Sequence, residues 1–186
     1  MKPLHSNSLL LAWRVTEAEA RRLNAPEIEP IHILIGIAKL VDVDLPSLAS
    51  KNLPDRDEIL EEYLREVRRL RTVLRTAQVD PTALRRALRG KPTHKRISVP
   101  DSETLHRSTA ARKTFDDADH FAQLADSPVY PVHLLYAVLL HEDDGIQAVC
   151  ANLSIDKKRF QEVASREVIW RNEDTSHGNK PRTRWN

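Results

Sequence analysis

Two stretches of this chain read almost alike, and they decide its architecture. Residues 29–37 read EPIHILIGI and residues 130–138 read YPVHLLYAV, an offset of 101 positions. Further along, residues 79–80 (VD) match residues 155–156 (ID) at an offset of 76. The difference, 101 minus 76, means that the first copy carries 25 additional residues between its second and fourth helical segments. Such self-similarity indicates an internal structural repeat.

Each copy contains the pattern of four helices. Apolar side chains recur every three or four residues, and Pro30 and Pro131 stand where the first turn of a helix tolerates proline. The expected helices cover about 6–24, 30–41, 57–78 and from 80 in copy one, and about 102–125, 131–140, 144–153 and from 156 in copy two. The sequence therefore predicts an all-α fold, a pseudo-twofold duplicated four-helix repeat with about eight helices.

The central and the elongated helices have distinct signatures. The segments 31–41 and 132–140 are apolar on both faces, which predicts the buried centre of each copy. The third helix of copy one is elongated, and Asp55 with Glu58 predicts a capping box at its start. The additional residues either present a docking surface or brace the domain.

The expected boundaries follow from this pattern. One domain covers residues 1–170, with repeat one at 5–90, a linker at 91–100 and repeat two at 101–170. Residues 171–186 are polar and lack an apolar period, which predicts a flexible tail.

Composition narrows the class of protein. The 186 residues are 40% hydrophobic and 30% charged, the profile of a soluble globular protein. Four glycines and 5% aromatic residues disfavour sandwiches and barrels. The single cysteine, Cys150, excludes an internal disulfide and fits a reducing compartment. The apolar run at 9–13 is too short for a signal peptide or a membrane span, so a cytoplasmic location is expected.

The duplicated motif resembles a known family. Two four-helix copies, each with a Pro-x-His-(Ile/Leu)-Leu helix opening and a fourth helix introduced by (Val/Ile)-Asp, resemble the N-terminal repeat domain of the Clp and Hsp100 AAA+ unfoldases over about residues 5–168. The resemblance implies a non-catalytic domain without cofactors. Such a domain binds unfolded or adaptor-delivered protein substrates and passes them to an AAA+ Clp ATPase in cis or in trans.

The ATPase itself has no counterpart in these residues. With glycines only at 36, 90, 145 and 178, the phosphate-binding loop motif cannot be written. The sequence leaves open whether the chain acts alone or as the front part of an ATPase.

The resemblance also implies a binding site. Family members hold unfolded segments in an apolar groove on the second repeat, which points here to Phe115, His133 and Leu134. The alternative is that Phe115 and Leu134 are core residues, since helical spacing predicts burial equally well. Members that bind phosphoarginine carry an acidic residue directly before each histidine. Ile31 and Val132 stand there instead, so phosphoarginine binding is not expected.

A basic stretch supports a different function. Residues 65–96 hold eleven basic and two acidic side chains. The candidate basic surface consists of Arg65, Arg68, Arg69 and Arg75. Such a helix can follow the phosphates of a nucleic acid. However, Glu61 and Glu66 are spaced to pair with arginines of the same helix, and no aromatic residues interleave to stack bases. An acidic partner or a solvated face is therefore favoured over nucleic acid.

Three further features resemble catalytic or metal sites. His32 and His133 recur in the repeat but lack partners at metal-ligand spacing, so we expect each to bond near its own helix start. Cys150 aligns with Leu74, which predicts a buried apolar role.

The carboxylate pairs at 116–117 and 143–144 are adjacent on expected helices. Neighbouring side chains on a helix diverge by about 100°, so a solvated or capping role is favoured over acid–base catalysis.

Overall fold

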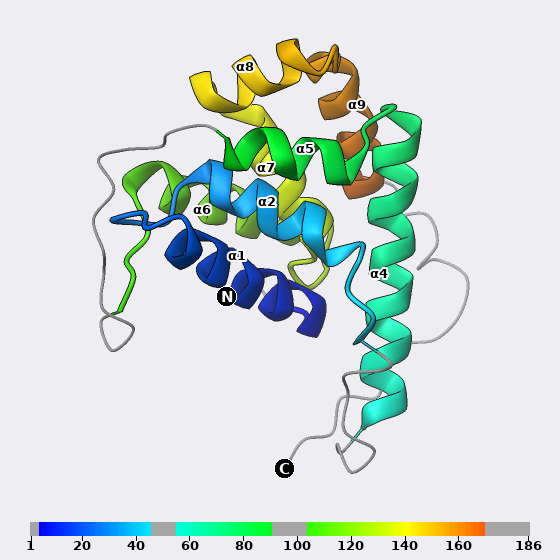
Figure 1. Cartoon of the computed structure of the whole chain (residues 1–186). Helices are drawn as coiled ribbons and strands as arrows, with labels where there is room; N and C mark the ends of the chain where they lie inside the picture. Colours follow the sequence, from blue (N-terminus) through cyan, green and yellow to red (C-terminus); the bar gives the residue numbers. More distant parts are fainter. Residues whose placement is uncertain (1–3, 46–54, 91–103, 170–186) are drawn as a thin grey trace.

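The computed structural model describes residues 4–45, 55–90 and 104–169, and these ranges hold eight α helices and no strand (Figure 1). The helices are α1 (Asn7–Arg22), α2 (Pro30–Leu40), α4 (Arg56–Thr76), α5 (Pro81–Arg89), α6 (Thr109–Leu124), α7 (Pro131–Leu140), α8 (Asp144–Asn152) and α9 (Lys157–Ile169). The predicted all-α, duplicated four-helix fold is confirmed. Within the described ranges, no helix is both long enough and apolar enough to cross a membrane.

The predicted linker at 91–100 and the tail at 171–186 lie outside the described residues. The domain boundaries given above therefore stay predictions.

Matching caps begin the first helix of each repeat. The Ser6 hydroxyl accepts a hydrogen bond from the Leu9 amide, and the Ser108 hydroxyl accepts one from the Ala111 amide, both at 3.1 Å. A serine at this position satisfies an amide that the first helical turn leaves without a partner. The two serines are 102 positions apart, because 108 minus 6 is 102. The first helices therefore align at an offset of 102, one more than the central helices.

Matching turns end the corresponding helices. Asn24 and Asp126 both adopt a left-handed backbone conformation after α1 and α6, with φ of 53° and 46°. Gln78 and Ser154 do so after α4 and α8, with φ of 58° and 55°. Asparagine and aspartate tolerate this conformation better than most residues. The repeat is therefore present in the turn geometry as well as in the motif.

The central helices α2 and α7 form the buried core, as predicted. All residues of α2 except Lys39 are buried, and α7 is buried except for Tyr136 and Leu140. Each central helix packs between the first and fourth helices of its own repeat, α1 and α5 around α2, and α6 and α9 around α7.

The first pair of helices approaches closely at Gly36. A Cβ atom at this position would lie 2.1 Å from the Thr16 Oγ1 of α1. The equivalent residue of α7 is Ala137, so repeat two leaves room there for a methyl group.

The residues directly before the first helix of each repeat form its lead-in segment, and this segment forms hydrogen bonds with the other repeat. The Ser6 amide donates to the Val129 carbonyl (3.1 Å), and the Val129 amide donates to the Leu4 carbonyl (2.7 Å). In the reverse direction, the Ile28 amide donates to the His106 carbonyl (2.8 Å), and the Ser108 amide donates to the Ile28 carbonyl (2.9 Å). The four bonds follow the same pattern twice.

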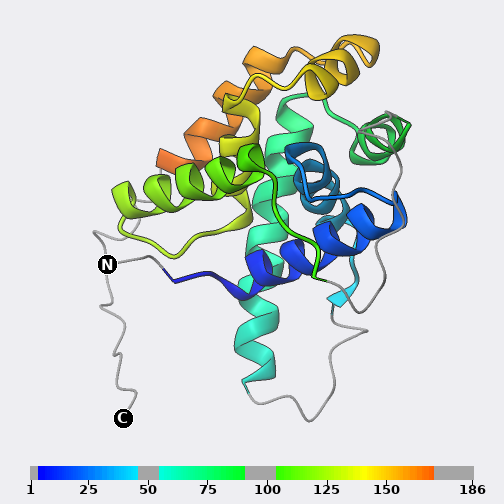
Figure 2. The same cartoon turned by 90° about the vertical axis from the view of Figure 1, so that its left-hand side faces the viewer.

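Equivalent aromatic residues meet at the centre of this arrangement. Trp13 of α1 and Phe115 of α6 are 102 positions apart, and their rings lie edge to face with centroids at 5.3 Å. The Arg107 guanidinium lies 5.8 Å from the Trp13 ring and 5.0 Å from the Phe115 ring. Helices α1 and α6 lie on one face of the molecule (Figure 2). This contact of equivalent residues places the pseudo-twofold axis between α1 and α6.

The elongated helix α4 braces the end of α2. Its 21 residues compare with nine in α8. The buried Tyr63 hydroxyl lies 2.9 Å from the Leu40 carbonyl and 2.8 Å from the Val43 carbonyl, and Arg71 donates to the Val41 carbonyl. The single Tyr63 hydroxyl proton bonds one of its two carbonyls, and Arg71 supplies a donor at the C-terminal end of α2, where a helix leaves carbonyls without partners.

The predicted capping box of α4 is wrong. Asp55 precedes the helix with φ 53° and ψ 25°, and its side chain makes no capping hydrogen bond. A capping side chain reaches the first-turn amides from an extended backbone conformation, which the left-handed Asp55 does not have.

Candidate functional site

The repeated histidines have a structural role, as predicted. The Glu29 amide donates to Nδ1 of His32 (3.0 Å), and the Tyr130 amide donates to Nδ1 of His133 (2.9 Å). Both imidazoles are buried at the start of their central helices. In the described ranges, no group of three or more His, Cys, Asp or Glu side chains is arranged to hold a metal ion.

The predicted groove residues lie in the interior. Phe115, His133 and Leu134 are all buried, and the Phe115 ring packs on Trp13. Their placement matches the alternative that Phe115 and Leu134 belong to the core. Their role in partner binding stays a prediction.

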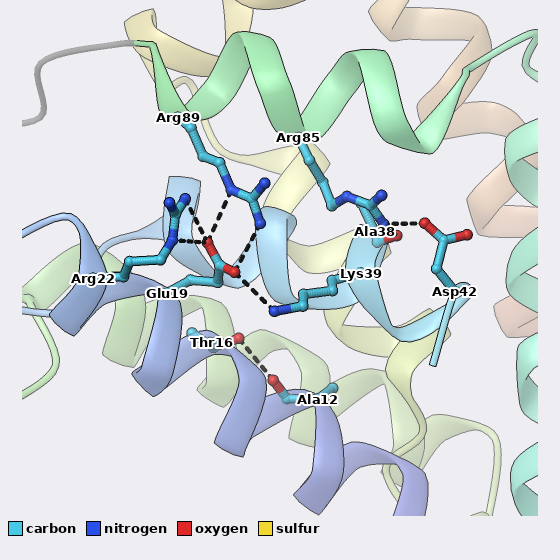
Figure 3. Close-up of polar contacts among 9 residues, drawn as sticks. All are labelled: Ala12, Thr16, Glu19, Arg22, Ala38, Lys39, Asp42, Arg85 and Arg89. Atoms are coloured by element: carbon cyan, nitrogen blue, oxygen red, sulfur yellow. Dashed lines mark hydrogen bonds and ion pairs between the residues drawn. The ribbon is translucent and has the colours of Figure 1, made fainter. Parts of the chain in front are cut away.

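The most developed polar cluster surrounds Glu19 of α1 (Figure 3). The Glu19 side chain is only 2% exposed, and its two carboxylate oxygens accept hydrogen bonds from three cations. Arg89 of α5 donates at 2.9 and 2.8 Å, Lys39 of α2 at 3.0 Å, and Arg22 at 3.3 and 3.2 Å. The cluster therefore joins three helices of repeat one.

The electrostatics of Glu19 follow from this arrangement. Burial raises the pKa of Glu19, but hydrogen bonds from Arg89 and Lys39 and their positive charges outweigh it and lower the pKa from 4.5 to about 2. Glu19 is therefore ionised at neutral pH and holds the cations in place.

A pocket opens beside this cluster, between α2 and α5. It has a volume of about 240 Å³ and is lined by Lys39, Asp42, Val43, Arg85 and Arg89. Arg85 donates to the Ala38 carbonyl (2.9 Å) and forms an ion pair with Asp42 (Figure 3). The pocket is mainly cationic.

Repeat two has neutral and mostly apolar residues at the equivalent positions. The offsets are 102 for α1, 101 for α2 and 76 for α5. They place Phe121, Leu124, Leu140, Gln161 and Ser165 opposite Glu19, Arg22, Lys39, Arg85 and Arg89. Leu124 is 66% exposed and Leu140 is 37% exposed. Phe121 packs on Tyr136 with ring centroids 4.9 Å apart.

A groove of about 470 Å³ lies on this side of repeat two. It has an apolar part and a polar part. The apolar part consists of Leu140, Cys150, Ala151 and Ile155, and the polar part consists of Glu142, Gln147, Lys157, Lys158 and Gln161. The resemblance implied an apolar groove on the second repeat at Phe115, His133 and Leu134, and none of these residues lines the groove described here. A sequence signal for this groove is Leu140, which is exposed at the end of a mostly buried helix.

The cysteine in this groove is not activated. Cys150 is buried, as predicted, and burial raises the pKa of its thiol, although the Lys157 charge acts in the opposite direction. A thiol with a raised pKa stays protonated at neutral pH and is a weak nucleophile.

One carboxylate of each predicted pair has a structural partner. The Asp143 side chain caps α8 by accepting from the Ile146 amide at 2.9 Å. Asp117 Oδ2 lies 2.8 Å from His141 Nε2. These contacts match the predicted capping and surface roles.

The four arginines of the predicted basic surface on α4 fall into two groups. Arg65 and Arg69 flank the buried Glu66, with nitrogen–oxygen distances of 3.9 and 3.7 Å. Arg68 and Arg75 are exposed, and neither has an ion-pair or hydrogen-bond partner among the described residues. The predicted pairing of Glu66 with Arg69 is present, and part of the helix's charge is neutralised.

Known structures share this fold. No protein-family model and no curated protein sequence matches the chain. The Hsp104 N-terminal domain from Candida albicans is similar at a TM-score of 0.58 and 17% identity, over 90% of this chain and 93% of that one. A chain from a structural investigation of a malarial protein secretion system is similar at a TM-score of 0.58 and 15% identity, over 88% and 94%. The chain therefore has the fold of a Clp/Hsp100 N-terminal repeat domain, which confirms the predicted resemblance in fold.

Proposed function

We propose that the chain is a non-catalytic protein-binding module that recruits unfolded or adaptor-delivered substrates to a Clp-type AAA+ unfoldase. The observation that supports this most directly is the groove of repeat two, which joins exposed apolar surface to a charged rim on a Clp/Hsp100 N-domain fold. Exposed apolar surface bordered by polar groups is typical of protein-interaction sites.

The size of the groove indicates weak, transient binding. Burial of one large aliphatic side chain contributes about 1.5–3 kcal/mol. A groove of about 470 Å³ accommodates only a few such side chains. Ordering a flexible segment offsets part of this gain, so we expect a dissociation constant of about 10 μM or weaker. Weak binding suits a module that must release its substrate to an unfoldase.

A pair of matched variants tests the groove. Leu140→Lys introduces the residue of repeat one into the groove, and Leu64→Lys makes the same change on α4, where Leu64 has the same exposure of 37%. We expect a fluorescently labelled, reduced and carboxymethylated polypeptide to bind the native chain and the Leu64→Lys variant, and to lose about tenfold in affinity for Leu140→Lys. Fluorescence anisotropy gives the three affinities. Equal affinities for both variants, or no binding to the native chain, would contradict the proposal.

Delivery to an unfoldase is a separate step with its own test. Addition of the chain to a Clp-type ATPase that lacks its own N-terminal domain should increase unfolding of the bound polypeptide. The Leu140→Lys variant should not. Substrate binding without any increase would leave a binding module and remove the recruiting role.

The exposed arginines of α4 favour a second candidate function, binding of an acidic partner or a nucleic acid. Arg68 and Arg75 lie on the same helix and are seven residues apart, or about 10 Å along its axis. Binding at this surface should weaken steeply with salt and should be lost in the Arg68→Glu/Arg75→Glu variant. Groove binding should survive both changes.

A further inference from the structure

We infer that the pocket between α2 and α5 binds a single oxyanion of a polypeptide partner, a carboxylate or a phosphorylated side chain. The inference concerns repeat one and does not rest on the groove of repeat two. The arguments are the excess of positive charge, the free donors and the fixed positions of the cations.

Positive charge exceeds negative charge in this region. The cations are Lys39, Arg85 and Arg89, which line the pocket, and Arg22, which joins them through Glu19. The anions are Asp42 and Glu19. Four positive charges and two negative charges leave a net charge of +2. The C-terminal ends of α1, α2 and α5, whose last turns hold Arg22, Lys39 and Arg89, each add a partial charge of about −0.5, so a smaller positive excess remains.

The cations keep donors for a ligand. A guanidinium has five N–H donors and an ammonium has three. Arg89 donates to Glu19 from its Nε and from one terminal nitrogen, and Lys39 donates one hydrogen bond to Glu19. Neither side chain has another hydrogen-bond partner in the part of the chain that the structure describes. The Lys39 side chain is 44% exposed and that of Arg89 is 31% exposed, so both can meet a ligand from solvent.

Glu19 is a positioning residue in this site. Its buried carboxylate fixes the head groups of Lys39 and Arg89, which come from different helices. A cation that is already held in place loses less conformational freedom when it binds an anion. The free arginines of α4 lack such an anchor, which distinguishes this pocket from an ordinary basic surface.

The geometry favours one anionic group over a nucleic-acid backbone. The pocket is small, at about 240 Å³, and the acidic Asp42 lines it together with the cations. A nucleic acid presents a long row of phosphates and requires a basic track. A single carboxylate or phosphate on a protein matches the observed site.

Solution NMR with small anions tests the inference. Inorganic phosphate and acetate are titrated separately into the ¹⁵N-labelled chain, with chloride adjusted to hold ionic strength constant. We expect saturable shifts at the amides of Lys39, Val43, Arg85 and Arg89 for at least one anion. Tighter binding of phosphate indicates a phosphorylated partner, and tighter binding of acetate indicates an acidic side chain.

The first variant installs the residue of repeat two, and the second is its control. Lys39→Leu removes one pocket cation but keeps the Glu19 bonds to Arg89 and Arg22, and we expect binding about tenfold weaker. Arg68→Gln removes a positive charge from α4 and should bind as the native chain does. If the spectrum of Lys39→Leu shows loss of fold, Arg85→Gln replaces it with the same expectation.

Two results would overturn the inference. The first is shifts that do not saturate or that spread evenly over basic surfaces. The second is equal affinity of Lys39→Leu and Arg68→Gln for the anion. The groove variant Leu140→Lys should keep full anion affinity, so failure of this site and failure of the proposed function are distinguishable.

Discussion

The two repeats differ in side-chain chemistry at positions where their backbones correspond. In repeat one, three cations surround the buried Glu19, whereas repeat two has Phe121, Leu124 and Leu140 at the matching positions of its first and central helices. The core behind them stays apolar and buried in both repeats. Leu84 of α5 matches Phe160 of α9, and both are fully buried. The same four-helix unit therefore holds an ion cluster at this place in one copy and an apolar cluster in the other.

This difference shows at which positions the side chains of a duplicated fold can change. A core position must fill its space, because voids and overpacking both destabilise. A position at the edge of the core can exchange an ion cluster for an apolar contact if all members change together. A single exchange leaves either a charge without its partner or an apolar group facing cations.

The largest expected effect comes from Glu19→Ala, which removes the anion and keeps its three cations. We expect the free energy of unfolding to fall by about 3 kcal/mol, near the low end for breaking a buried ion pair because Arg22 and Lys39 are partly exposed. Urea unfolding followed by circular dichroism measures the loss. Glu17→Ala on the same helix is the control, since its Arg21 pair is near the surface and contributes below about 1 kcal/mol. Equal losses would mean that the Glu19 cluster stabilises the fold no more than the Glu17–Arg21 pair does.

The second prediction concerns pH. The pKa of Glu19 is about 2 in the folded chain, whereas its ordinary value in an unfolded chain is 4.5, so its ionised form stabilises the folded state at pH values above 4.5. That contribution is lost as the pH falls through 4.5 towards 2, because protons then bind the unfolded chain first. We expect the stability difference between the native chain and Glu19→Gln to shrink by about 2 kcal/mol over this range. Urea unfolding at several pH values gives the difference, and a constant difference would refute the assignment.

An intermediate effect is expected where α1 approaches α2. Gly36→Ala gives repeat one the residue of repeat two, and its new methyl group would overlap the Thr16 side chain. We expect a loss of about 1.5 kcal/mol in thermal or urea unfolding, the usual cost of overpacking. The reverse exchange, Ala137→Gly, should cost about 1 kcal/mol through helix propensity and a lost methyl contact. If Gly36→Ala were more stable than the native chain, α1 and α2 would be no closer together than α6 and α7.

The smallest effect is expected at Leu124, the most exposed residue of the apolar cluster in repeat two. Leu124→Arg gives repeat two the residue of repeat one, and Leu124 is already 66% exposed. The free energy of unfolding should change by less than about 0.5 kcal/mol. Urea unfolding checks this value, and a loss above 1 kcal/mol would show that Leu124 packs more tightly than its exposure indicates.

Local and periodic features were predictable from the sequence. The apolar runs of α2 and α7, the prolines that open them and the roles of His32 and His133 all depend on residues within one turn of each other. Their fold follows from hydrogen bonding and helical periodicity. Asp55 is the exception, since aspartate is common both as a helix cap and in left-handed turns, and residue type alone does not decide between them.

The candidate sites were harder to predict because they join distant helices. Glu19, Lys39 and Arg89 come from α1, α2 and α5, and no single offset aligns all three with repeat two. The loop before the central helix is one residue shorter in repeat two, and the extra residues in repeat one change the offset again. The burial of Phe115 also depended on contact with Trp13, a partner 102 positions away.

The crossed hydrogen bonds of the lead-in segments have a consequence for assembly. One repeat carries both complementary parts, a lead-in segment at Ser6 and an acceptor loop at Ile28, yet each part bonds with the other repeat. Two identical copies of a single repeat could exchange these contacts about a true twofold axis. The pseudo-twofold domain thus has the geometry of a homodimer whose subunits are joined in one polypeptide. Because the two repeats are joined covalently, each can change its own surface cluster and still keep the other repeat as its partner.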